Sequence, residues 1–374
     1  MPDSFYIGLM SGTSLDGVDA VLASFNAQGK PRVLARASEA FPEMLRAEFL
    51  SLNQADGQNE LARAALAANA LAEVYARAVH AALITSGLPA ARICAIGAHG
   101  QTVRHQPAQG FTIQLNAPAK LTELTGISVI ADFRSRDVAA GGQGAPLVPM
   151  FHAGVFACSH PRVVLNLGGI ANITILRPDT HPMGFDTGPA NVLMDLWCQR
   201  HTGQAYDTDG AWGASGVVHN GLFQHLLGSE PWFDLPAPKS TGRDLFHQAW
   251  LEQRLLFVVG QDRSSDLLRT QDVQATLRAL TTQSVALAIS RYVPDAVDVL
   301  VCGGGARNAA LMRDLQLALG CRVEITDSAG IETQDVEALA FAWLAWAHQN
   351  GQAASHPAVT GARGPRILGA TWPA

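Results

Sequence analysis

Lysine is scarce in this sequence of 374 residues: only Lys30, Lys120 and Lys239 occur, and the formal net charge is −6. Domains that bind nucleic acid usually carry a dense basic stripe, and no such stripe offsets the acidic residues here. We therefore expect no nucleic-acid partner.

Cysteine and long apolar runs are also limited. The five cysteines form no CxxC pair, so neither structural disulfides nor a cysteine-bound zinc ion is expected, and a reducing cytosol is the natural compartment. The N-terminus has no basic stretch followed by an apolar core, so it does not resemble a signal peptide. No apolar run approaches the roughly 20 residues that a membrane helix needs. We expect a cytoplasmic protein with no membrane partner.

The composition is typical of a folded protein of about two domains. Hydrophobic residues make up 48% and charged residues 16% of the chain, which favours buried sheets over disorder. Strand and helix patterns alternate, and this predicts an α/β fold with mostly parallel sheets. The predicted strands cover residues 5–9, 18–25, 31–37, 93–98, 127–131, 162–167, 172–176, 183–185, 298–302 and 322–325, and the predicted helices cover 59–86, 271–292, 308–319 and 334–349.

The pattern restarts after residues 139–149, a segment rich in Gly and Pro that we interpret as a junction between two lobes. Each half opens with two strands around a glycine turn, which suggests an ancient duplication. The expected domains are residues 1–134 plus 338–374 for the N-terminal lobe and 135–337 for the C-terminal lobe.

Three glycine turns follow strands, namely Ser11–Gly17, Gly168-Gly169 and Gly303–Gly305. Converging backbone N–H groups with no Cβ in the way make a good cradle for phosphate, and the third turn opens a helix, whose N-terminus favours anions. One such turn is weak evidence, because a hairpin needs glycine for conformational reasons alone. The sequence contains no GxxxxGK[ST], no GxGxxG after the first strand and no GxSxG, so the usual alternative motifs are absent.

The three turns resemble the phosphate-1, phosphate-2 and adenosine motifs of the actin, hexokinase and Hsp70 superfamily, most clearly in NLGGIANITIL. The resemblance implies an α/β fold of the two-lobed actin-like ATPase (ribonuclease H-like) type, with duplicated mixed sheets and a central cleft. One residue departs from the pattern, because the acid that usually begins the second phosphate hairpin is Asn166 here. The carboxylate must then come from elsewhere, and we nominate Asp186.

A narrower resemblance runs in order from residue 7 to residue 370. The chain is similar to the anhydro-N-acetylmuramic acid kinase family in GLMSGTSLDGVDAVL, IGAHGQTVRH, ADFRSRDVAAGGQGAPLVP, NLGGIANIT, GFDTGPANVLMD, KSTGRDLF, VCGGGARN and TGARGPRILGA. This resemblance implies conversion of 1,6-anhydro-N-acetylmuramic acid, ATP and water into N-acetylmuramic acid 6-phosphate and ADP, a step in recycling cell-wall sugars. It also implies a homodimer that uses ATP with Mg²⁺.

That reaction requires a base. In the anhydro sugar O6 is tied to C1, so water must attack C1 while O6 takes up the γ-phosphoryl group. We assign the base to Asp186, at the predicted end of a strand, where α/β sheets place ligands. The competing interpretation is an N-cap or turn aspartate for the helix that begins near Asn191.

The nucleotide is assigned to the three glycine turns. The hydroxyls of Ser11, Thr13 and Ser14 are expected to contact phosphate oxygens. Asp16 is a candidate ligand of Mg²⁺, directly or through water; alternatively, it only closes an Asp-Gly turn. The ATP-binding residues predicted are Gly12, Thr13, Ser14, Leu15, Asp16, Gly17, Val18, Asp19, Gly168, Gly169, Gly304 and Gly305.

The sugar is assigned to polar residues elsewhere in the chain. The resemblance of HGQTVRH implies that His99 lies in a polar loop after a strand and contacts sugar hydroxyls; a zinc site lacks a third ligand. Glu337 is expected to line the same pocket, unless it lies on a solvated helix face. Trp343 and Trp346 are interpreted as core residues, and Trp212 is the better candidate for stacking on a sugar.

Arg134 and Arg136 lie in the charged segment DFRSRD. Because Arg binds a carboxylate as a planar fork, these residues are candidates to hold the lactyl carboxylate of a muramic acid. A salt bridge between the lobes, made with Asp132 or Asp137, is the alternative. Arg134 is the residue that we assign to the substrate.

Two other functions remain open. An actin- or Hsp70-like nucleotide switch would use ATP hydrolysis to drive a partner, and it would be expected to carry an appendage that this chain, ending soon after its last helix, does not show. A kinase of an ordinary hexosamine would keep the fold and change only the substrate.

Overall fold

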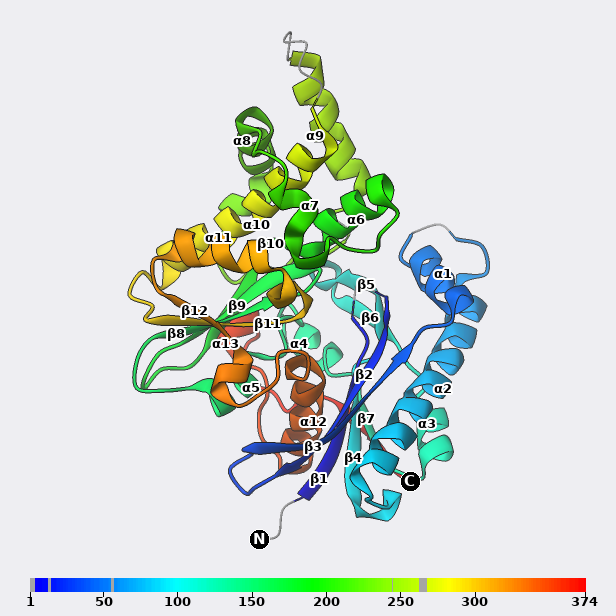
Figure 1. The fold of residues 1–374 in the computed structure, drawn as a ribbon. Coiled ribbons are helices and arrows are strands. Elements are labelled where there is room, and N and C mark those ends of the chain that lie inside the picture. Colours follow the sequence, from blue (N-terminus) through cyan, green and yellow to red (C-terminus); the bar gives the residue numbers. More distant parts are fainter. Residues whose placement is uncertain (1–3, 13–14, 55–56, 244, 262–267) are drawn as a thin grey trace. The chain divides into compact units, whose positions relative to one another are not determined.

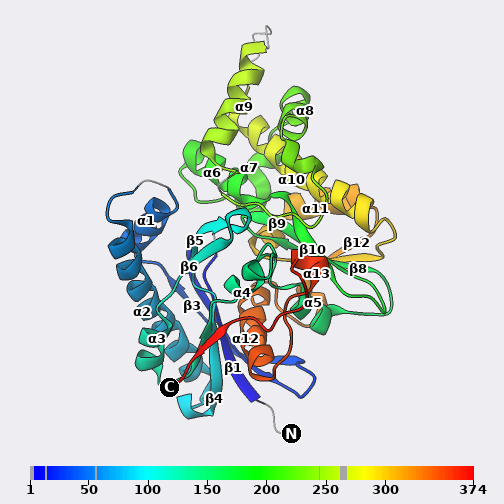
Figure 2. The same cartoon turned by 180° about the vertical axis from the view of Figure 1, so that it is seen from behind.

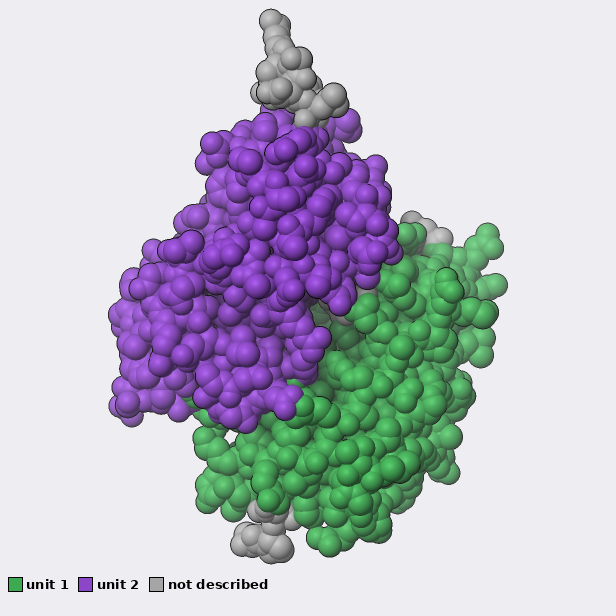
Figure 3. Space-filling view, viewed as in Figure 1, with its two compact units in different colours: residues 1–156, 335–374 green, residues 157–334 purple. Residues whose placement is uncertain are grey.

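The structure is a computed structural model that describes residues 4–12, 15–54, 57–243, 245–261 and 268–374, without the side chains of 259–261. The chain divides into two compact units, coloured separately in Figure 3: unit 1 comprises Met1–Phe156 and Asp335–Ala374, and unit 2 comprises Ala157–Gln334. The chain thus passes into unit 2 after residue 156, beyond the expected boundary at 134. Residues 135–156 belong with unit 1 because Asp137 accepts a hydrogen bond from Thr360 and Phe151 packs against Trp343.

Unit 1 is built on a six-stranded sheet in the order β13-β7-β4-β1-β2-β3. Strands β1, β2 and β3 form an antiparallel meander, as expected for the first two, whereas β4 and β7 continue the sheet in parallel with β1. Strand β13 pairs antiparallel with β7 at the far edge (Figure 2). The strands are β1 (Ser4–Met10), β2 (Gly17–Phe25), β3 (Pro31–Ala40), β4 (Ile93–Ala98), β7 (Val129–Ala131) and β13 (Ala370–Trp372).

Helices cover both faces of this sheet. Helix α12 (Val336–Gln349) packs on β1, β2 and β4, while α1 (Glu43–Leu52), α2 (Glu60–Ser86) and α3 (Pro118–Thr125) lie on the opposite side (Figure 1). Helix α12 approaches the strands so closely that a Cβ on Gly8 or Gly97 would overlap its backbone carbonyls. The shorter helices of unit 1 are α4 (Ser135–Ala139), α5 (Pro149–Phe156) and α13 (Pro357–Thr360).

A separate two-stranded sheet follows β4 in unit 1. It consists of β5 (Gln101–Gln106) and β6 (Phe111–Leu115), paired antiparallel. The motif HGQTVRH led to the expectation of a polar loop here, and that expectation is wrong for residues 101–106. Thr102 alternates with the buried Gln101 and Val103, but the alternation stops before His105 and is too short for the strand period to be read from the sequence.

Unit 2 repeats the strand order of unit 1. Its sheet runs β10-β9-β8-β11-β12, which matches β3-β2-β1-β4-β7, with three antiparallel strands followed by two parallel ones. The repeat agrees with the predicted duplication and makes both sheets mixed, so the expectation of mostly parallel sheets is wrong. The strands are β8 (Arg162–Leu167), β9 (Ile170–Leu176), β10 (Met183–Pro189), β11 (Asp298–Cys302) and β12 (Arg322–Ile325).

One face of the unit 2 sheet forms its core. Leu165, Ile173 and Phe185 are fully buried among the helices that pack around α10. Since side chains alternate between the faces of a strand, the residues next to them point to the other face. The helices of unit 2 are α6 (Asn191–Thr202), α7 (Ala211–Ala214), α8 (Asn220–Gly228), α9 (Gln248–Gln261), α10 (Thr270–Tyr292) and α11 (Ala309–Leu319).

The starts of the parallel strands in unit 2 are joined by charge. Asp298 on β11 is completely buried and accepts two hydrogen bonds of 2.8 Å from Arg162 on β8. Arg322 on β12 and His160 add bonds of 3.0 and 3.1 Å to the same carboxylate. Hydrogen bonds from Arg162 hold the pKa of Asp298 far below its ordinary value. This cluster fixes three strands in register.

None of the helices in the described ranges combines the length and the apolar character that crossing a membrane requires.

Candidate active site

Asp186 lies at an irregularity in strand β10. The strand continues to Pro189, and its pairing with β9 shifts between Asp186 and Gly188. A bulge of this kind redirects a side chain, and bulges are frequent beside active sites. The N-cap position of α6 belongs to Ala190, so the alternative interpretation of Asp186 as the helix cap is wrong. Its side chain is only 7% exposed.

A segment far along the chain holds Asp186 in place. The backbone N–H of Asp186 donates to the carbonyl of Lys239 over 3.0 Å, and the N–H of Thr241 donates to Asp186 Oδ2 over 2.8 Å. The Lys239 ammonium donates to the carbonyls of Trp232 and Phe233 and lies 4.1 Å from the centre of the Trp232 ring. Burial, followed by Arg291, lowers the pKa of Lys239 to about 8. The segment 239–241 is thus anchored, and it orients the carboxylate.

Asp186 is the last member of a polar row across three strands. Asn172 on β9 pairs with Asn166 on β8 and with Asp186 on β10. Residues directly opposite one another share a face, and the flanking Leu165 and Ile173 belong to the core. The row therefore lies on the face away from the core of unit 2, at the carboxyl end of β8.

The turn Gly168-Gly169 joins β8 to β9 and packs against the start of α6. The carbonyl of Gly168 accepts from Asn191 N–H over 3.1 Å, and that of Gly169 accepts from the N–H groups of Ala190 and Val192 over 2.9 and 3.0 Å. The first turn of α6 therefore donates to the protein itself. The groups of this turn that can donate to an anion are the backbone N–H groups of Gly168 and Gly169.

The third glycine turn lies beside the first residue of the polar row. Gly303 has a left-handed φ of 82°, and a Cβ there would overlap the side-chain oxygen of Asn166. Gly305 packs on Leu167, where a Cβ would come within 2.6 Å of the Leu167 Cβ, while a Cβ on Gly304 would meet only Asn191 Nδ2, at an ordinary contact distance of 3.8 Å. Gly303 and Gly305 are thus required by packing, and Gly304 leaves room for a ligand.

In unit 1, the first glycine turn joins β1 to β2. Thr13 and Ser14, predicted to bind ATP, lie outside the described residues. The carbonyl of Gly12 accepts from Leu15 N–H and from Gln101 Nε2, each over 3.3 Å. Leu15 is 1% exposed with a left-handed φ of 60°, so only its backbone can face a nucleotide.

The remaining residues of this turn differ in exposure. Asp16 is exposed, and its carbonyl accepts from Phe41 N–H over 3.1 Å. Gly17 is required by packing, since a Cβ would overlap the carbonyl of Glu39. Val18 is buried in the core. Asp19 is exposed, and its Oδ1 accepts from the Ser38 hydroxyl over 2.6 Å.

The contacts of Ser11 indicate a structural role. Its side chain is 1% exposed, its hydroxyl donates to the carbonyl of Gly100 over 2.9 Å, and it lies 3.1 Å from the Tyr75 hydroxyl. Tyr75 in turn accepts from Gly100 N–H over 3.0 Å. The Ser11 hydroxyl therefore joins β1 to the end of β4, and this geometry does not support its expected contact with phosphate.

His99 and Arg134 are brought together in unit 1. His99 is buried, its Nε2 lies 2.9 Å from Arg134 Nη2, and its Nδ1 lies 3.2 Å from the Ser11 carbonyl. Because Arg134 can only donate, Nε2 is the acceptor and Nδ1 carries the proton. Burial, followed by the charge of Arg134, lowers the pKa of His99 to about 3, so the ring is neutral at pH 7.

Arg134 reaches the loop after α4 as well. Its Nη1 donates to the carbonyl of Gly144 over 2.7 Å, while Arg136 donates to the carbonyl of Ile367 over 3.0 Å. Asp137, one of the two proposed salt-bridge partners, accepts instead from Gly144 N–H and from the Thr360 hydroxyl. The guanidinium of Arg134 is thus half-buried and held on two sides.

The other residues assigned to the sugar are placed as follows. Glu337 is half-buried in the first turn of α12. Trp343 and Trp346 are buried, and Trp346 stacks on Phe25, which confirms the predicted core role. Trp212 is half-buried and packs against the core of unit 2.

The residues present fit a magnesium ion that is bound mainly through a nucleotide. In such sites phosphates and water supply most ligands, and the protein adds one or two carboxylates. The described part of the chain contains no group of three or more His, Cys, Asp or Glu side chains that could hold a metal alone. The exposed Asp16, beside the first glycine turn, fits the role of a single carboxylate ligand.

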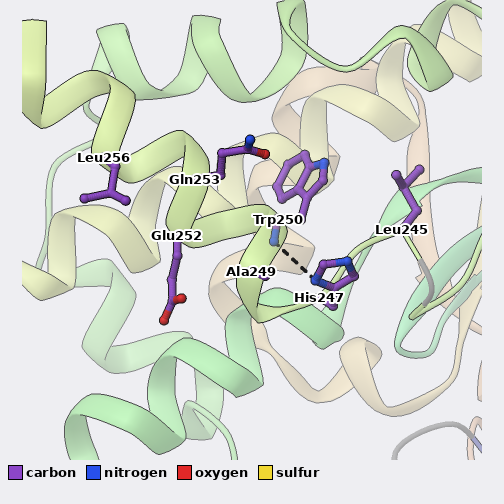
Figure 4. Close-up of a pocket in the computed structure, with 7 residues that line it drawn as sticks. All are labelled: Leu245, His247, Ala249, Trp250, Glu252, Gln253 and Leu256. Carbon is purple, nitrogen blue, oxygen red and sulfur yellow. Dashed lines mark hydrogen bonds between the residues drawn. The ribbon is translucent and has the colours of Figure 1, made fainter. Parts of the chain in front are cut away.

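A shallow cavity of about 490 Å³ lies elsewhere in unit 2 (Figure 4). Leu245 and residues of α9, including Trp250, line it, and His247 Nδ1 accepts the N–H of Trp250 over 3.2 Å. No residue predicted to bind ATP or sugar lines this cavity, so it is separate from the candidate active site.

The fold and these turns define a class. Two units with one shared strand order, each with a glycine turn after its first strand, form the duplicated ribonuclease H-like sheets of an actin-like ATPase. The model of the family described as anhydro-N-acetylmuramic acid kinase matches residues 4–374, and the chain belongs to this family. The expected central cleft stays a prediction.

Relatives agree over the whole chain. It is 60% identical to the anhydro-N-acetylmuramic acid kinase of Bordetella petrii, over 100% of this chain and 97% of that one. It is 51% identical to the enzyme of the same name from Chromobacterium violaceum, over 98% and 99% of the two chains. A ROK family glucokinase structure from Streptomyces griseus, in complex with glucose and AMPPNP, aligns over 91% of this chain and 98% of that one at 14% identity with a TM-score of 0.39.

Two residues of the site escaped the sequence analysis. Thr241 lies in the motif KSTGRDLF and Asn172 in the motif NLGGIANIT. Both motifs indicate the family, but neither predicts a role for these two residues. Strand alternation could have placed Asn172 on the face of Asn166. Only the three-dimensional structure brings Thr241 to Asp186.

Proposed function

We propose that this chain hydrolytically opens 1,6-anhydro-N-acetylmuramic acid and phosphorylates O6 with ATP, giving N-acetylmuramic acid 6-phosphate and ADP. The observation that carries the proposal is the placement of Asp186. Its carboxylate lies at a bulge, is bound by the Thr241 N–H and sits on the sheet face that carries the polar row. Family membership supplies the substrate.

Asp186 acts as the base in this proposal. It removes a proton from water as the water oxygen attacks C1 and the C1–O6 bond breaks. The departing O6 takes the γ-phosphoryl group, so phosphorus stabilises the leaving oxygen and no second carboxylic acid is needed. The Thr241 N–H fixes Oδ2, which orients the carboxylate.

The glycine turns serve ATP. In unit 2, phosphate oxygens accept hydrogen bonds from the backbone N–H groups of Gly168, Gly169, Gly304 and Gly305. In unit 1, they bind the backbone of Gly12–Asp19. Phosphoryl transfer depends mainly on positioning and charge neutralisation, so no covalent nucleophile is required. Mg²⁺, held by Asp16 and the phosphates, would neutralise phosphate charge when bound.

The sugar is assigned to residues of unit 1. Arg134 offers a fixed guanidinium for the lactyl carboxylate, and Glu337 is proposed to contact the same ligand. His99 has both ring nitrogens engaged, so a direct contact with the sugar requires one of these bonds to be exchanged. We further propose that the protein is cytoplasmic and forms a homodimer. Light scattering of the purified protein would test the dimer.

The test is a product assay. Purified protein with ATP, Mg²⁺ and 1,6-anhydro-N-acetylmuramic acid should form ADP and a reducing sugar 6-phosphate in equal amounts. The control replaces the anhydro sugar with N-acetylglucosamine. ADP release that is equally fast without sugar would identify a nucleotide switch, and faster phosphorylation of N-acetylglucosamine would identify a hexosamine kinase.

A further inference from the structure

Asn172 has an unmet hydrogen-bonding requirement. Its Oδ1 is buried and accepts no hydrogen bond from any residue in the described part of the chain. Nearly all buried polar atoms in folded proteins have a partner, because leaving one unpaired is costly. An acceptor in this state beside a proposed active site indicates a donor that comes with the reactants.

The position of Asn172 restricts what that donor is. Asn172 lies directly opposite Asp186, and opposed residues of antiparallel strands have Cβ atoms about 5 Å apart. The two side chains are therefore neighbours on one face of the sheet, close enough for one small molecule to donate a hydrogen bond to each. Water has two O–H groups and meets this requirement.

The third member of the row does not compete for this role. Asn166 is engaged on the far side of Asn172, where its Oδ1 receives the thiol of Cys302 over 3.8 Å and borders Gly303. An amide cannot act as a base, so the proton itself goes to Asp186.

We propose that Asn172 Oδ1 accepts a hydrogen bond from the nucleophilic water and, together with Asp186, orients that water toward C1. This inference rests on the proposed function. In the step, the water oxygen bonds to C1, the C1–O6 bond breaks, and O6 bonds to the γ-phosphorus as ADP departs. One water proton passes to Asp186; the other stays on the product hydroxyl and is held by Asn172 in the transition state.

Two variants test the proposal by steady-state kinetics. Asn172→Ala removes the acceptor, so kcat should fall about 10- to 100-fold, the range for a misplaced reactant, while the KM values for ATP and sugar stay within about threefold. Asn172→Asp keeps an acceptor oxygen and the side-chain shape, so it should recover most of kcat at alkaline pH. The added charge beside Asp186 disfavours ionisation of the base, and the acid limb of the pH profile should move to higher pH.

Thr174→Val is the matched control. Thr174 lies two residues along β9 on the same face and is buried, and its change to Val should leave kcat within about twofold. Nucleotide binding and thermal midpoints of all variants establish that they are folded.

The outcomes are separable. A rise in the sugar KM of Asn172→Ala without loss of kcat would make Asn172 a sugar ligand and overturn the proposal, as would an unshifted acid limb in Asn172→Asp. Full activity of Asn172→Ala alongside an inactive Asp186→Asn would reject this inference and leave the proposed function intact. Absence of sugar phosphate from the unaltered protein would reject the proposed function itself.

Discussion

Units 1 and 2 use one strand order but join the starts of their parallel strands by different forces. In unit 1 the first paired residues of β1 and β4 are the apolar Phe5 and Ile93, with the Arg92 guanidinium 5.3 Å from the Phe5 ring. In unit 2 the equivalent strands are joined through the buried Asp298 and its cationic partners. The same frame can therefore be closed by burial of apolar surface or by a charge cluster.

The opposite ends of the strands differ in a way that bears on chemistry. The row across the meander of unit 1 is Met10, Asp19 and Ser38, and it places its acid on the middle strand, where Ser38 binds it. The row in unit 2 places Asp186 on the third strand, where the backbone N–H of Thr241 orients its carboxylate. The strand that carries the acid, and what holds that acid, distinguish the two copies.

The largest expected effect concerns the charge cluster of unit 2. Asp298→Asn should lower the free energy of unfolding by about 3–5 kcal/mol, because it removes the fully buried negative charge that pairs with the half-buried Arg162. Chemical denaturation measures this. The control is Asp295→Asn in the exposed pair with Arg177, which should not change stability measurably. Equal effects of the two substitutions would contradict the comparison.

The next effect compares the two acids. Asp186→Asn should lower kcat by about 10²-fold or more, the range for a general base, while ATP binding persists. Asp19→Asn should act mainly on the KM for ATP, since its carboxylate is bound by Ser38. Steady-state assays measure both. Near-normal turnover of Asp186→Asn would remove Asp186 as the base.

Mild acid should destabilise unit 1 more than unit 2, because the lowered pKa values of His201 and His225 in unit 2 belong to less buried side chains. Burial lowers the pKa of His99 and of His152 to about 3, against about 6.5 in an unfolded chain, so the unfolded state takes up protons first and stability falls as pH drops below 6.5. At pH 6 the loss is about 1 kcal/mol for each histidine.

Asp298 in unit 2 also loses stability as pH falls, but from a different cause and at lower pH: hydrogen bonds from Arg162 favour its charged form, whereas burial disfavours the charged form of the histidines. Its folded pKa is depressed, so its stabilisation is complete above the unfolded value near 3.9 and is lost as pH falls through and below it. Peptide-resolved hydrogen exchange between pH 8 and 4 should detect opening in unit 1 first. Opening of unit 2 first would refute the assignment.

The smallest expected effect concerns the glycine turns. Gly17→Ala should cost at least about 1 kcal/mol, because its Cβ overlaps β3. Gly168→Ala has space for its Cβ, whose nearest neighbour is the Ile170 carbonyl oxygen at 3.5 Å, and should change stability by no more than about 0.5 kcal/mol. Any effect of Gly168→Ala should appear in the KM for ATP. Thermal denaturation and ATP titration would separate the two turns.

The sequence was sufficient where local signals were strong. Strand β8 has the predicted bounds, and the predicted end of helix α2 at residue 86 is confirmed, with Gly87 as its C-cap at a left-handed φ of 70°. Strand β5 was missed because it is short and mostly polar, and β6 because its alternation of apolar and polar residues spans only five residues. The unit boundary was displaced because it depends on contacts such as Asp137 with Thr360, 223 residues apart.

The candidate active site, too, could be predicted only where a local motif indicated it. Asp186 was identified from its motif, without knowledge of its bulge. The partners that orient it could not be predicted: Thr241 lies 55 residues away, and the relation of Asn172 to Asp186 depends on strand register.

Helix α12 packs directly on Gly8 and Gly97, and this contact has a consequence for folding during synthesis on the ribosome. Five of the six strands of the unit 1 sheet are made first, yet the helix that covers one of their faces is made only after the whole of unit 2. At about 5–20 residues per second that delay lasts on the order of ten seconds or more. Unit 2 is continuous and can fold during this interval, so the half of the protein that is translated second is free to be completed first.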